Sequence, residues 1–209
     1  MRTIAALLIG LGLCLAGCNG STKGPSAPTQ DDMSLGNPNA KVTVVEYASV
    51  GCPICAAWNN QTYPAFKAKY IDTGKIHYVL KEMLTGDAPV AAAGFLLARC
   101  AGKDKYFTIV DEVWRQEAPY LEHEDAGAQK RDILVKIAQS AGMTQDQFTA
   151  CVDNEAALKA LNAKAQRYEE QDKITGTPTF VINGKTLQSN FPSMADMDQA
   201  IAQAQASAK

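Results

Sequence analysis

Two cysteines, Cys52 and Cys55, lie in the sequence Cys-Pro-Ile-Cys, a spacing at which two thiols can close a disulfide with each other. An apolar run rich in β-branched residues, at positions 42–48, precedes them and predicts a buried strand. Helix-compatible residues follow as far as about Tyr70, so Cys52 falls at a helix N-cap and Pro53 at the first helical position, where a proline is well tolerated. Unpaired N–H groups and the helix dipole favour a thiolate there. This arrangement is typical of dithiol–disulfide exchange chemistry.

Two other uses of a Cys-x-x-Cys pair have less support. A structural zinc site needs two more Cys or His ligands, and the sequence offers only His77 and His123 and no second close cysteine pair. Covalent haem attachment needs a histidine directly after the second cysteine, where this chain has Ala56. We therefore expect neither a metal nor a cofactor.

The N-terminal segment has the features of a processing signal. Arg2 precedes an apolar stretch, residues 4–15, that is shorter than a comfortable membrane span. The stretch ends in Leu-Ala-Gly-Cys, which resembles the lipobox of bacterial lipoproteins, in which the cysteine (here Cys18) is lipidated and becomes the mature N-terminus. The alternative is an ordinary secretory signal with an incidental cysteine. Both predict a periplasmic or other extracytoplasmic protein, and the first predicts a lipid anchor in a bacterial membrane.

The expected domain division follows from composition. Residues 1–17 are the predicted signal peptide, and residues 18–33 the lipidated N-terminus and a flexible tether, because they are polar and have almost nothing to bury. Residues 34–209 have the length of one domain. The formal net charge is −2 with no basic stripe, so nucleic acid is not an expected partner.

The other cysteines suggest a second disulfide. Of the six cysteines, Cys14 would leave with the signal and Cys18 would carry the lipid, which leaves Cys100 and Cys151 beside the Cys-Pro-Ile-Cys pair. In an oxidising compartment this second pair most simply forms a structural disulfide. Two free buried thiols and a catalytic relay are the alternatives.

The rest of the domain alternates in character. The sequence predicts a strand at 75–81, helices from about 90 to 173, a hairpin at 179–188 around Asn-Gly, and a last helix from about 193. Thr144 begins a capping box for a helix in which Phe148 and Cys151 share one face, so we expect Cys151 to be buried against the helix of Cys100. Trp58 is expected in the core, and residues 121–125 as a solvated acidic loop.

Four sets of residues together resemble the DsbA-like thioredoxin superfamily. They are Leu-Gly-Asn-Pro-Asn-Ala-Lys-Val at 35–42, Glu-Tyr at 46–47, Cys-Pro-Ile-Cys at 52–55 and Gly-Thr-Pro-Thr-Phe at 176–180. The likeness runs from about residue 34 to the end. It implies an α/β thioredoxin fold with an inserted helical domain at about 87–172, and thiol–disulfide exchange on extracytoplasmic proteins.

The resemblance also implies roles for individual residues. Cys52 matches the exposed nucleophile and Cys55 its buried partner. Glu46 matches a buried acid that assists proton transfer at the inner thiol; from the residues alone, a solvent-facing glutamate at a strand edge is the alternative. Thr177 and Pro178 match a loop whose proline is cis and packs beside the disulfide. Secreted or envelope proteins with cysteines are the implied substrates, and a membrane protein the implied reoxidising partner.

Position 54 departs from the family pattern, because Ile54 stands where the best-known oxidants carry histidine. Isoleucine offers no charge or hydrogen bond to the Cys52 thiolate, which predicts a milder oxidant. The expected function is oxidation of secreted or envelope protein thiols through Cys52 and Cys55. A disulfide reductase or isomerase, and a non-enzymatic copper carrier that uses both thiolates, are the alternatives.

Overall fold

The computed structural model describes residues 27–116 and 127–208. The predicted signal peptide, Cys18, most of the predicted tether and the acidic loop expected at 121–125 lie outside the described residues. In the described part of the chain, no helix combines the length and the apolar character that crossing a bilayer requires.

A five-stranded mixed sheet lies at the centre of the described residues, in the order β1-β3-β2-β4-β5. The strands are β1 (Met33–Gly36), β2 (Thr43–Ala48), β3 (His77–Glu82), β4 (Thr179–Ile182) and β5 (Lys185–Thr186). Strands β2 and β3 are parallel, and the other neighbouring pairs are antiparallel. The predicted Asn-Gly hairpin is confirmed, since Ile182 pairs with Lys185 across the two-residue turn.

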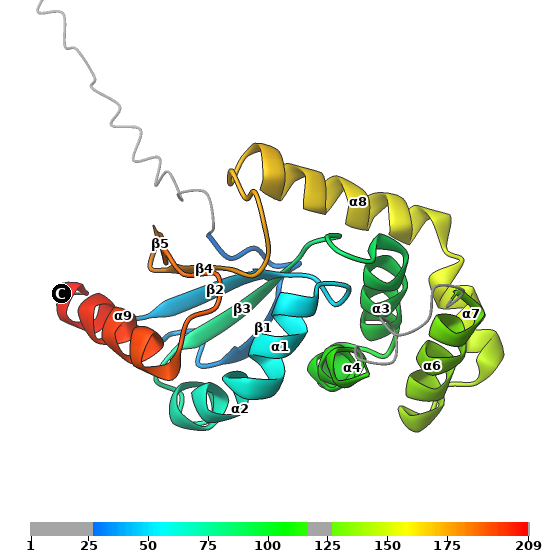
Figure 1. Ribbon diagram of the computed structural model, residues 1–209, viewed down its shortest axis with the longest axis horizontal. Coiled ribbons are helices and arrows are strands. Elements are labelled where there is room, and N and C mark those ends of the chain that lie inside the picture. The colour runs from blue at the N-terminus through cyan, green and yellow to red at the C-terminus, as the bar shows by residue number, and fades with distance from the viewer. Residues whose placement is uncertain (1–26, 117–126, 209) are drawn as a thin grey trace, which may run out of the picture.

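The helices cover both faces of this sheet and extend beyond it (Figure 1). They are α1 (Pro53–Gln61), α2 (Tyr63–Phe66), the π-helical turn η1 (Lys67–Ile71), α3 (Ala88–Cys100), α4 (Lys103–Arg115), α6 (Gly127–Ser140), α7 (Gln145–Val152), α8 (Glu155–Glu170) and α9 (Met194–Ser207). Helices α1, α2 and α9 lie on one face of the sheet and α8 crosses the other, while α3, α4, α6 and α7 form a block at one side. This is a thioredoxin fold with a helical domain inserted between β3 and β4, as predicted.

The helix that carries the cysteines is shorter than predicted. One continuous helix to about Tyr70 was expected, but α1 ends at Gln61 and the chain restarts as α2 and η1. Pro64 stands in the first turn of α2, where its missing N–H interrupts a continuous helical hydrogen-bond ladder. The break leaves a short helix α1, with Cys52 as its N-cap and Cys55 in its first turn, ahead of α2 and η1.

Strand β2 divides its side chains between two cores. Val45 and Tyr47 belong to a small cluster with Tyr168 of α8, whereas Val44 and Ala48 belong to the main core that contains α1. Because side chains alternate along a strand, Glu46 points into the main core with Val44 and Ala48. The fold therefore places a carboxyl group beneath the helix of the two thiols.

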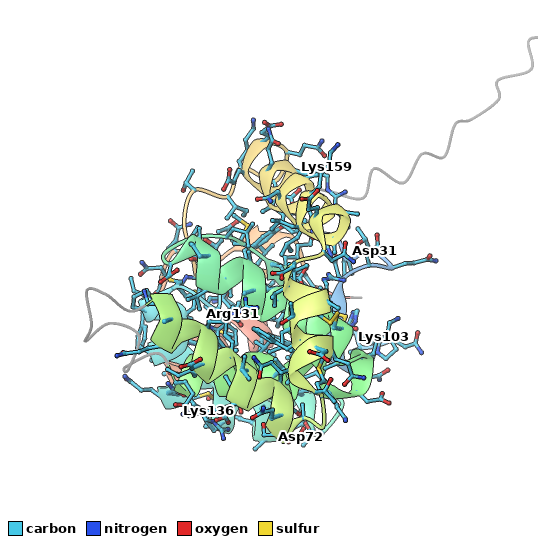
Figure 2. All side chains as sticks on the ribbon, turned by 90° about the vertical axis from the view of Figure 1, so that its right-hand side faces the viewer. Asp31, Asp72, Lys103, Arg131, Lys136 and Lys159 are labelled. Atoms are coloured by element: carbon cyan, nitrogen blue, oxygen red, sulfur yellow. A yellow bond between two sulfur atoms is a disulfide. The ribbon has the colours of Figure 1, made fainter. Side chains whose placement is uncertain are left out.

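The helical block is organised by caps and by one cation–aromatic contact. The capping box at Thr144 is confirmed, and the Asn154 side chain accepts a hydrogen bond from the first turn of α8. In Figure 2, which views the block end-on, Arg131 of α6 lies at the centre of the face. Its guanidinium carbon is 5.1 Å from the centroid of the Phe148 ring of α7. This contact joins α6 to α7 over the apolar face that was predicted for α7.

The packed domain begins earlier than expected. Asp32 was assigned to the flexible tether, but it is buried and accepts a hydrogen bond of 2.9 Å from the Tyr168 hydroxyl. The backbone carbonyl of Asp31 accepts from Arg99 and Lys164, at 3.2 and 3.0 Å. Met33, also assigned to the tether, begins β1. Polar contacts hold Asp31 and Asp32 against the domain, and an apolar sequence pattern gives no signal of such contacts.

Candidate functional site

Cys52 and Cys55 lie at the start of α1, directly after the strand β2 and its following loop. Cys52 is the N-cap residue, in an extended conformation, and Pro53 occupies the first turn. Both thiols are free, and both residues are buried: Cys52 retains 6% of its surface and Cys55 none. The expectation of an exposed Cys52 is thus corrected, because the loops of Thr177 and Gly86 lie against this residue and bury it. Ile54 beside it is 43% exposed.

The surroundings of Cys52 favour its thiolate and lower the pKa of this thiol from about 9 to about 6. The largest cause is a hydrogen bond from the Cys55 thiol; the Thr177 side chain and the N–H groups of Cys55 and Ile54 add to it, against the opposing effect of burial. These two N–H groups belong to the first turn of α1, where backbone donors have no helical partners. The helix start therefore adds to the stabilisation of the thiolate, after the larger effect of the Cys55 thiol.

Cys55 has the opposite environment. Burial raises its pKa well above the usual value, and the hydrogen bond to Cys52 and the charges of Cys52 and Glu46 act in the same direction. A backbone hydrogen bond from Ser49 opposes this shift only in part. At neutral pH the pair therefore holds one thiolate, on Cys52, and one thiol, on Cys55.

Glu46 is a buried carboxyl group with one hydrogen-bond partner. Its Oε2 atom accepts a bond of 2.5 Å from the Tyr78 hydroxyl, and its Oε1 atom is buried without a partner among the described residues. Burial raises the pKa of Glu46 to about 8; the Tyr78 hydrogen bond lowers it, and the negative charge of Cys52 raises it further. The carboxyl group is therefore mainly protonated at neutral pH, and it is not the solvent-facing residue that was the alternative.

The loop before β4 supplies the third part of the site. The Thr177–Pro178 peptide bond is cis. The Thr177 carbonyl oxygen lies 3.5 Å from the Cys52 sulfur and accepts a hydrogen bond from it when Cys52 is protonated. Antiparallel pairing of β4 with β2 brings this loop to Cys52 from 125 residues away in the sequence. The structure therefore brings together Cys52, Cys55, Glu46 and the Thr177-Pro178 loop.

Sequence reasoning missed a fourth component, the loop between β3 and α3. Gly86 has a φ of +71°, and a Cβ atom there would lie 2.0 Å from the Gly51 carbonyl oxygen and 3.1 Å from the Cys52 Cα atom. The Asp87 N–H donates to the Gly51 carbonyl at 2.8 Å. Thr85 lies in the same loop, with its Oγ1 atom 2.5 Å from that of Thr177. The glycine at 86 was the available signal, since a positive φ and a close backbone approach both require one.

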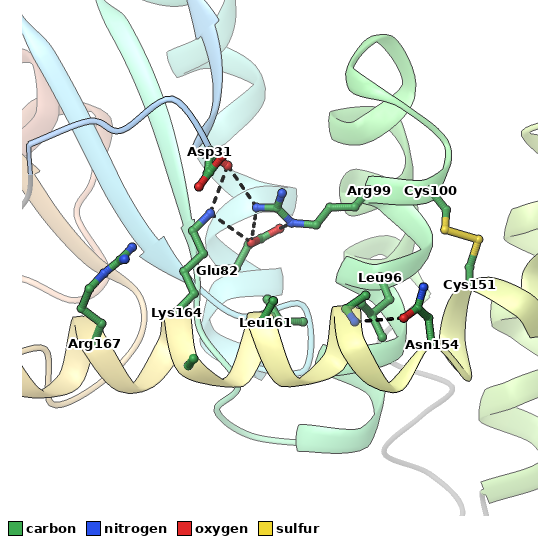
Figure 3. Close-up of a pocket in the computed structure, with 13 residues that line it drawn as sticks. Asp31, Glu82, Leu96, Arg99, Cys100, Cys151, Asn154, Leu161, Lys164 and Arg167 are labelled. Atoms are coloured by element: carbon green, nitrogen blue, oxygen red, sulfur yellow. Dashed lines mark hydrogen bonds and ion pairs between the residues drawn. A yellow bond between two sulfur atoms is a disulfide. The ribbon is translucent and has the colours of Figure 1, made fainter.

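The other two cysteines within the described residues form a disulfide at another place in the fold. Cys100 and Cys151 are joined, and 51 positions separate them in the sequence. Figure 3 shows the bond connecting α3 to the segment before α8. Cys100 is exposed and Cys151 half-buried, so the expected burial of Cys151 is corrected. The reason is that both residues lie at the ends of their helices, away from the packed middle.

A cavity of about 510 Å³ adjoins this disulfide between α3 and α8, and neither Cys52 nor Cys55 lines it. Glu82, fully buried, forms two hydrogen bonds with Arg99, at 2.7 and 2.6 Å, and Lys164 lies 3.7 Å from it (Figure 3). The buried carboxylate is thus neutralised within the protein. The cavity is separate from the thiol site and carries no reactive group besides the disulfide.

The described residues contain no group of three or more His, Cys, Asp or Glu side chains arranged to hold a metal ion. The dithiol and its surroundings form the candidate site. Their chemistry is proton transfer and exchange at sulfur.

Comparison with known proteins identifies the family. The thioredoxin family model matches residues 28–203. A Rickettsia bellii protein provisionally named protein-disulfide oxidoreductase is 33% identical over 156 residues, which are 74% of this chain and 58% of that protein. A Bacillus cereus protein provisionally named disulfide bond formation protein D is 25% identical over 77% of this chain and 74% of its own length. This chain thus spans about three fifths of the rickettsial relative.

Solved structures show the same fold. Wolbachia pipientis α-DsbA1 superposes with a TM-score of 0.78 at 22% identity, over 88% of this chain and 95% of that one. Oxidised BdbD from Bacillus subtilis gives 0.71 at 19% identity, over 83% and 92%. The chain belongs to the thioredoxin family and has the fold of the DsbA proteins within it.

Proposed function

We propose that this protein is an extracytoplasmic thiol–disulfide oxidoreductase that oxidises dithiols of other proteins through a Cys52–Cys55 disulfide. The observation that carries the proposal is the unequal environment of the two thiols, which lowers the pKa of Cys52 to about 6 and raises that of Cys55. A stabilised thiolate lowers the free energy of the reduced protein, and a disulfide with a stable reduced form is a good oxidant. The geometry thus favours electron flow from substrate to protein.

The reaction balances as two exchanges at sulfur. A substrate thiolate attacks Cys52 in the disulfide, the S–S bond breaks, and Cys55 leaves with the electron pair. The second substrate thiolate then attacks the substrate sulfur of the mixed disulfide and releases Cys52 as its thiolate. The substrate loses two electrons and gains a disulfide, and the protein gains the two electrons as a dithiol.

Glu46 is proposed to supply the proton that Cys55 needs. The released Cys55 thiolate is the less stable of the two, because burial and the neighbouring charges oppose it. A carboxyl group whose pKa lies near 8 is protonated at neutral pH and can give that proton up. The Glu46 carboxylate then takes up a proton again when the protein is reoxidised. The Thr177 carbonyl lies 3.5 Å from the Cys52 sulfur, and we propose that Thr177 and Pro178 form one wall of the substrate site.

Location and partners follow from the sequence features. The apolar N-terminal stretch and the Leu-Ala-Gly-Cys sequence support export and lipidation at Cys18. Secreted or envelope proteins with cysteine pairs are then the substrates. The reduced protein needs an electron acceptor, and a membrane protein that reoxidises the dithiol fits an anchored enzyme. The name disulfide bond formation protein D, carried by the Bacillus cereus relative, agrees with an oxidising direction.

The reduction potential of the Cys52–Cys55 pair tests the proposal. The full-length protein is equilibrated with defined ratios of reduced and oxidised glutathione, and its reduced fraction is read by alkylation. We expect a potential above about −200 mV, on the side of strong oxidants (about −120 mV) rather than of thioredoxin (about −270 mV). A value near that of thioredoxin would favour the reductase alternative. Tight binding of Cu(I) by the reduced protein, without catalysis of exchange, would favour a copper carrier.

A further inference from the structure

Ser49 lies three positions before Cys52, in the loop that joins β2 to α1, and it is fully buried. Its hydroxyl group donates to the Thr85 carbonyl at 2.8 Å and accepts from the Gly51 N–H at 3.1 Å. Its backbone carbonyl accepts from the Cys52 N–H at 3.2 Å and from the Trp114 indole N–H at 3.0 Å. One residue therefore contacts the loop after β3, helix α4 and the residue that carries the reactive sulfur.

The direction of each of these bonds is fixed by the groups that form it. A carbonyl oxygen only accepts and an N–H group only donates, so the single hydroxyl hydrogen of Ser49 lies in the bond to the Thr85 carbonyl. The oxygen of the same hydroxyl group binds the Gly51 N–H two residues on, a local contact that serine often makes in turns. The side chain thus closes a ring within its own turn and ties that turn to the neighbouring loop.

Residues 49–52 form the turn from which the chain enters α1. The bond from the Cys52 N–H to the Ser49 carbonyl spans three positions, as in a β-turn. Cys52 then adopts the extended N-cap conformation, with φ of −102° and ψ of 118°. Gly51, inside the turn, lies so close to the next loop that a Cβ atom would be 2.3 Å from the Asp87 carbonyl oxygen. A shift of this turn therefore also moves the Cys52 sulfur.

Helix α4 of the inserted helical block is joined to the same region by further bonds. The Asn59 side chain of α1 donates to Asp111 at 2.7 Å, and that of Asn60 donates to the Trp114 carbonyl at 3.4 Å. Trp114 is itself buried, and its indole N–H reaches the Ser49 carbonyl. The contact between α4 and α1 thus continues onto the turn that precedes α1.

We propose that Ser49 is a positioning residue, which holds the turn before α1 in the geometry that places the Cys52 sulfur for exchange. Its side chain acts through the backbone of the turn, and its carbonyl attaches the turn to the inserted helical block. A reacting group that is already held in place reacts faster than one that must first be ordered. The inference rests on the proposed function, because it concerns the rate of exchange at Cys52.

The test measures how fast a dithiol peptide reduces the Cys52–Cys55 disulfide of the full-length protein. Ser49→Thr and Ser49→Val have nearly the same shape, and only threonine keeps a hydroxyl group, so this pair separates the hydrogen bonds from the added volume. We expect Ser49→Ala and Ser49→Val to slow the reaction by roughly tenfold, since misplacement of a reacting group costs up to about a hundredfold. Ser49→Thr should recover most of that factor relative to Ser49→Val.

Ser140→Ala is the matched control, because the Ser140 hydroxyl also donates to a backbone carbonyl at 2.8 Å, at the end of α6. It should react at the parent rate. A folded Ser49→Ala protein that reacts as fast as the parent would overturn the inference, as would a Ser49→Thr protein as slow as Ser49→Val. If Ser49→Ala does not fold, Trp114→Phe removes the donor to the Ser49 carbonyl and keeps an aromatic ring. This variant should also be slower, and a parent rate for it would contradict the inference.

The reduction potential of the parent is measured first and distinguishes the two proposals. A parent as reducing as thioredoxin contradicts the proposed oxidising function. The comparison of rates among the Ser49 variants needs only exchange at Cys52, so it tests the positioning role in either case.

Discussion

The two cysteine pairs of this protein lie at opposite kinds of helix end. Cys52 is the N-cap of α1, whereas Cys100 is the last residue of α3 and Cys151 lies in the last turn of α7. The N-terminal end of a helix stabilises a negative charge, and the C-terminal end opposes it. A thiolate is thus favoured in the first pair and disfavoured in the second. The same residue type is placed for reactivity in one region and for permanence in the other.

The comparison extends to what each bond would constrain. A Cys52–Cys55 disulfide closes within one turn of α1, so it restrains almost nothing and can open at little cost to the fold. The Cys100–Cys151 bond closes a loop across a separation of 51 positions and joins two helices of the inserted block. Its loss releases much more chain entropy in the unfolded state. Activity and stability should therefore depend on different pairs.

The largest expected effect is on exchange activity. Cys52→Ala should reduce oxidation of a dithiol peptide by several orders of magnitude, because the attacked sulfur is absent. The double variant Cys100→Ala/Cys151→Ala should keep the parent rate. Alkylation of the reduced parent below neutral pH should label Cys52 before Cys55, since only Cys52 has a lowered pKa. A folded double variant that has lost its activity would instead assign Cys100 and Cys151 to a relay.

The second effect is on stability and should show the reverse order. Cys100→Ala/Cys151→Ala should lower the free energy of unfolding by about 4 kcal/mol, the chain-entropy value for a loop of this length. Denaturant unfolding of the oxidised proteins measures it, with Cys52→Ala/Cys55→Ala as the matched control. The comparison between the pairs fails if the control loses as much stability as the Cys100→Ala/Cys151→Ala protein.

The sequence predicted the parts of this site that depend on local pattern. The strand, the N-cap cysteine and the turn at Asn183 are specified by nearby residues, and the structure confirms these elements. Trp58 is fully buried, as expected of an aromatic residue on this helix, and its indole N–H donates to the Pro192 carbonyl. The burial of Glu46 was expected from family resemblance, because a glutamate within a strand is equally compatible with solvent.

The features that were missed depend on contacts between distant segments. Thr85 and Gly86 lie in a stretch that reads as an ordinary loop, and their role follows from the approach of Gly51 and Thr177. Asp32 was assigned to a tether because it is polar, although Tyr168 and Lys164 hold it in the packed domain. A pattern of apolar residues predicts which apolar side chains are buried. It does not predict the burial of a polar side chain whose hydrogen-bond partners lie far away in the sequence.

A third prediction concerns the carboxyl group beneath the active pair. The pKa of Glu46 is about 8 in the folded protein and close to 4.5 when exposed, so folding retains a proton that unfolding releases between these values. The stabilising contribution is complete below pH 4.5 and is lost as the pH rises toward 8. Glu46→Gln removes this dependence. It should stabilise the protein by roughly 3 kcal/mol at pH 7, and by little at pH 4.

Unfolding of the reduced parent and of Glu46→Gln at several pH values measures this difference. Glu82→Gln is the contrasting variant, because Glu82 is fully buried but paired with Arg99. It should be less stable than the parent, since it breaks a buried ion pair. A difference between Glu46→Gln and the parent that does not change with pH would mean that Glu46 titrates normally.

The smallest expected effect, on the exposed residue between the two thiols, sharpens the contrast between the pairs. Ile54 is 43% exposed, so histidine can replace it without disturbing the core. A protonated imidazole there adds a positive charge and a donor to those that the helix start already supplies to the Cys52 thiolate. Ile54→His should therefore lower the Cys52 pKa and raise the reduction potential by about 30 mV, which corresponds to roughly 1.4 kcal/mol for this two-electron couple.

Ile54→Leu is the apolar control for this variant. The gain should shrink above about pH 6.5, where the imidazole loses its proton. Equal potentials for the parent and for Ile54→His would show that position 54 does not tune the stability of the Cys52 thiolate.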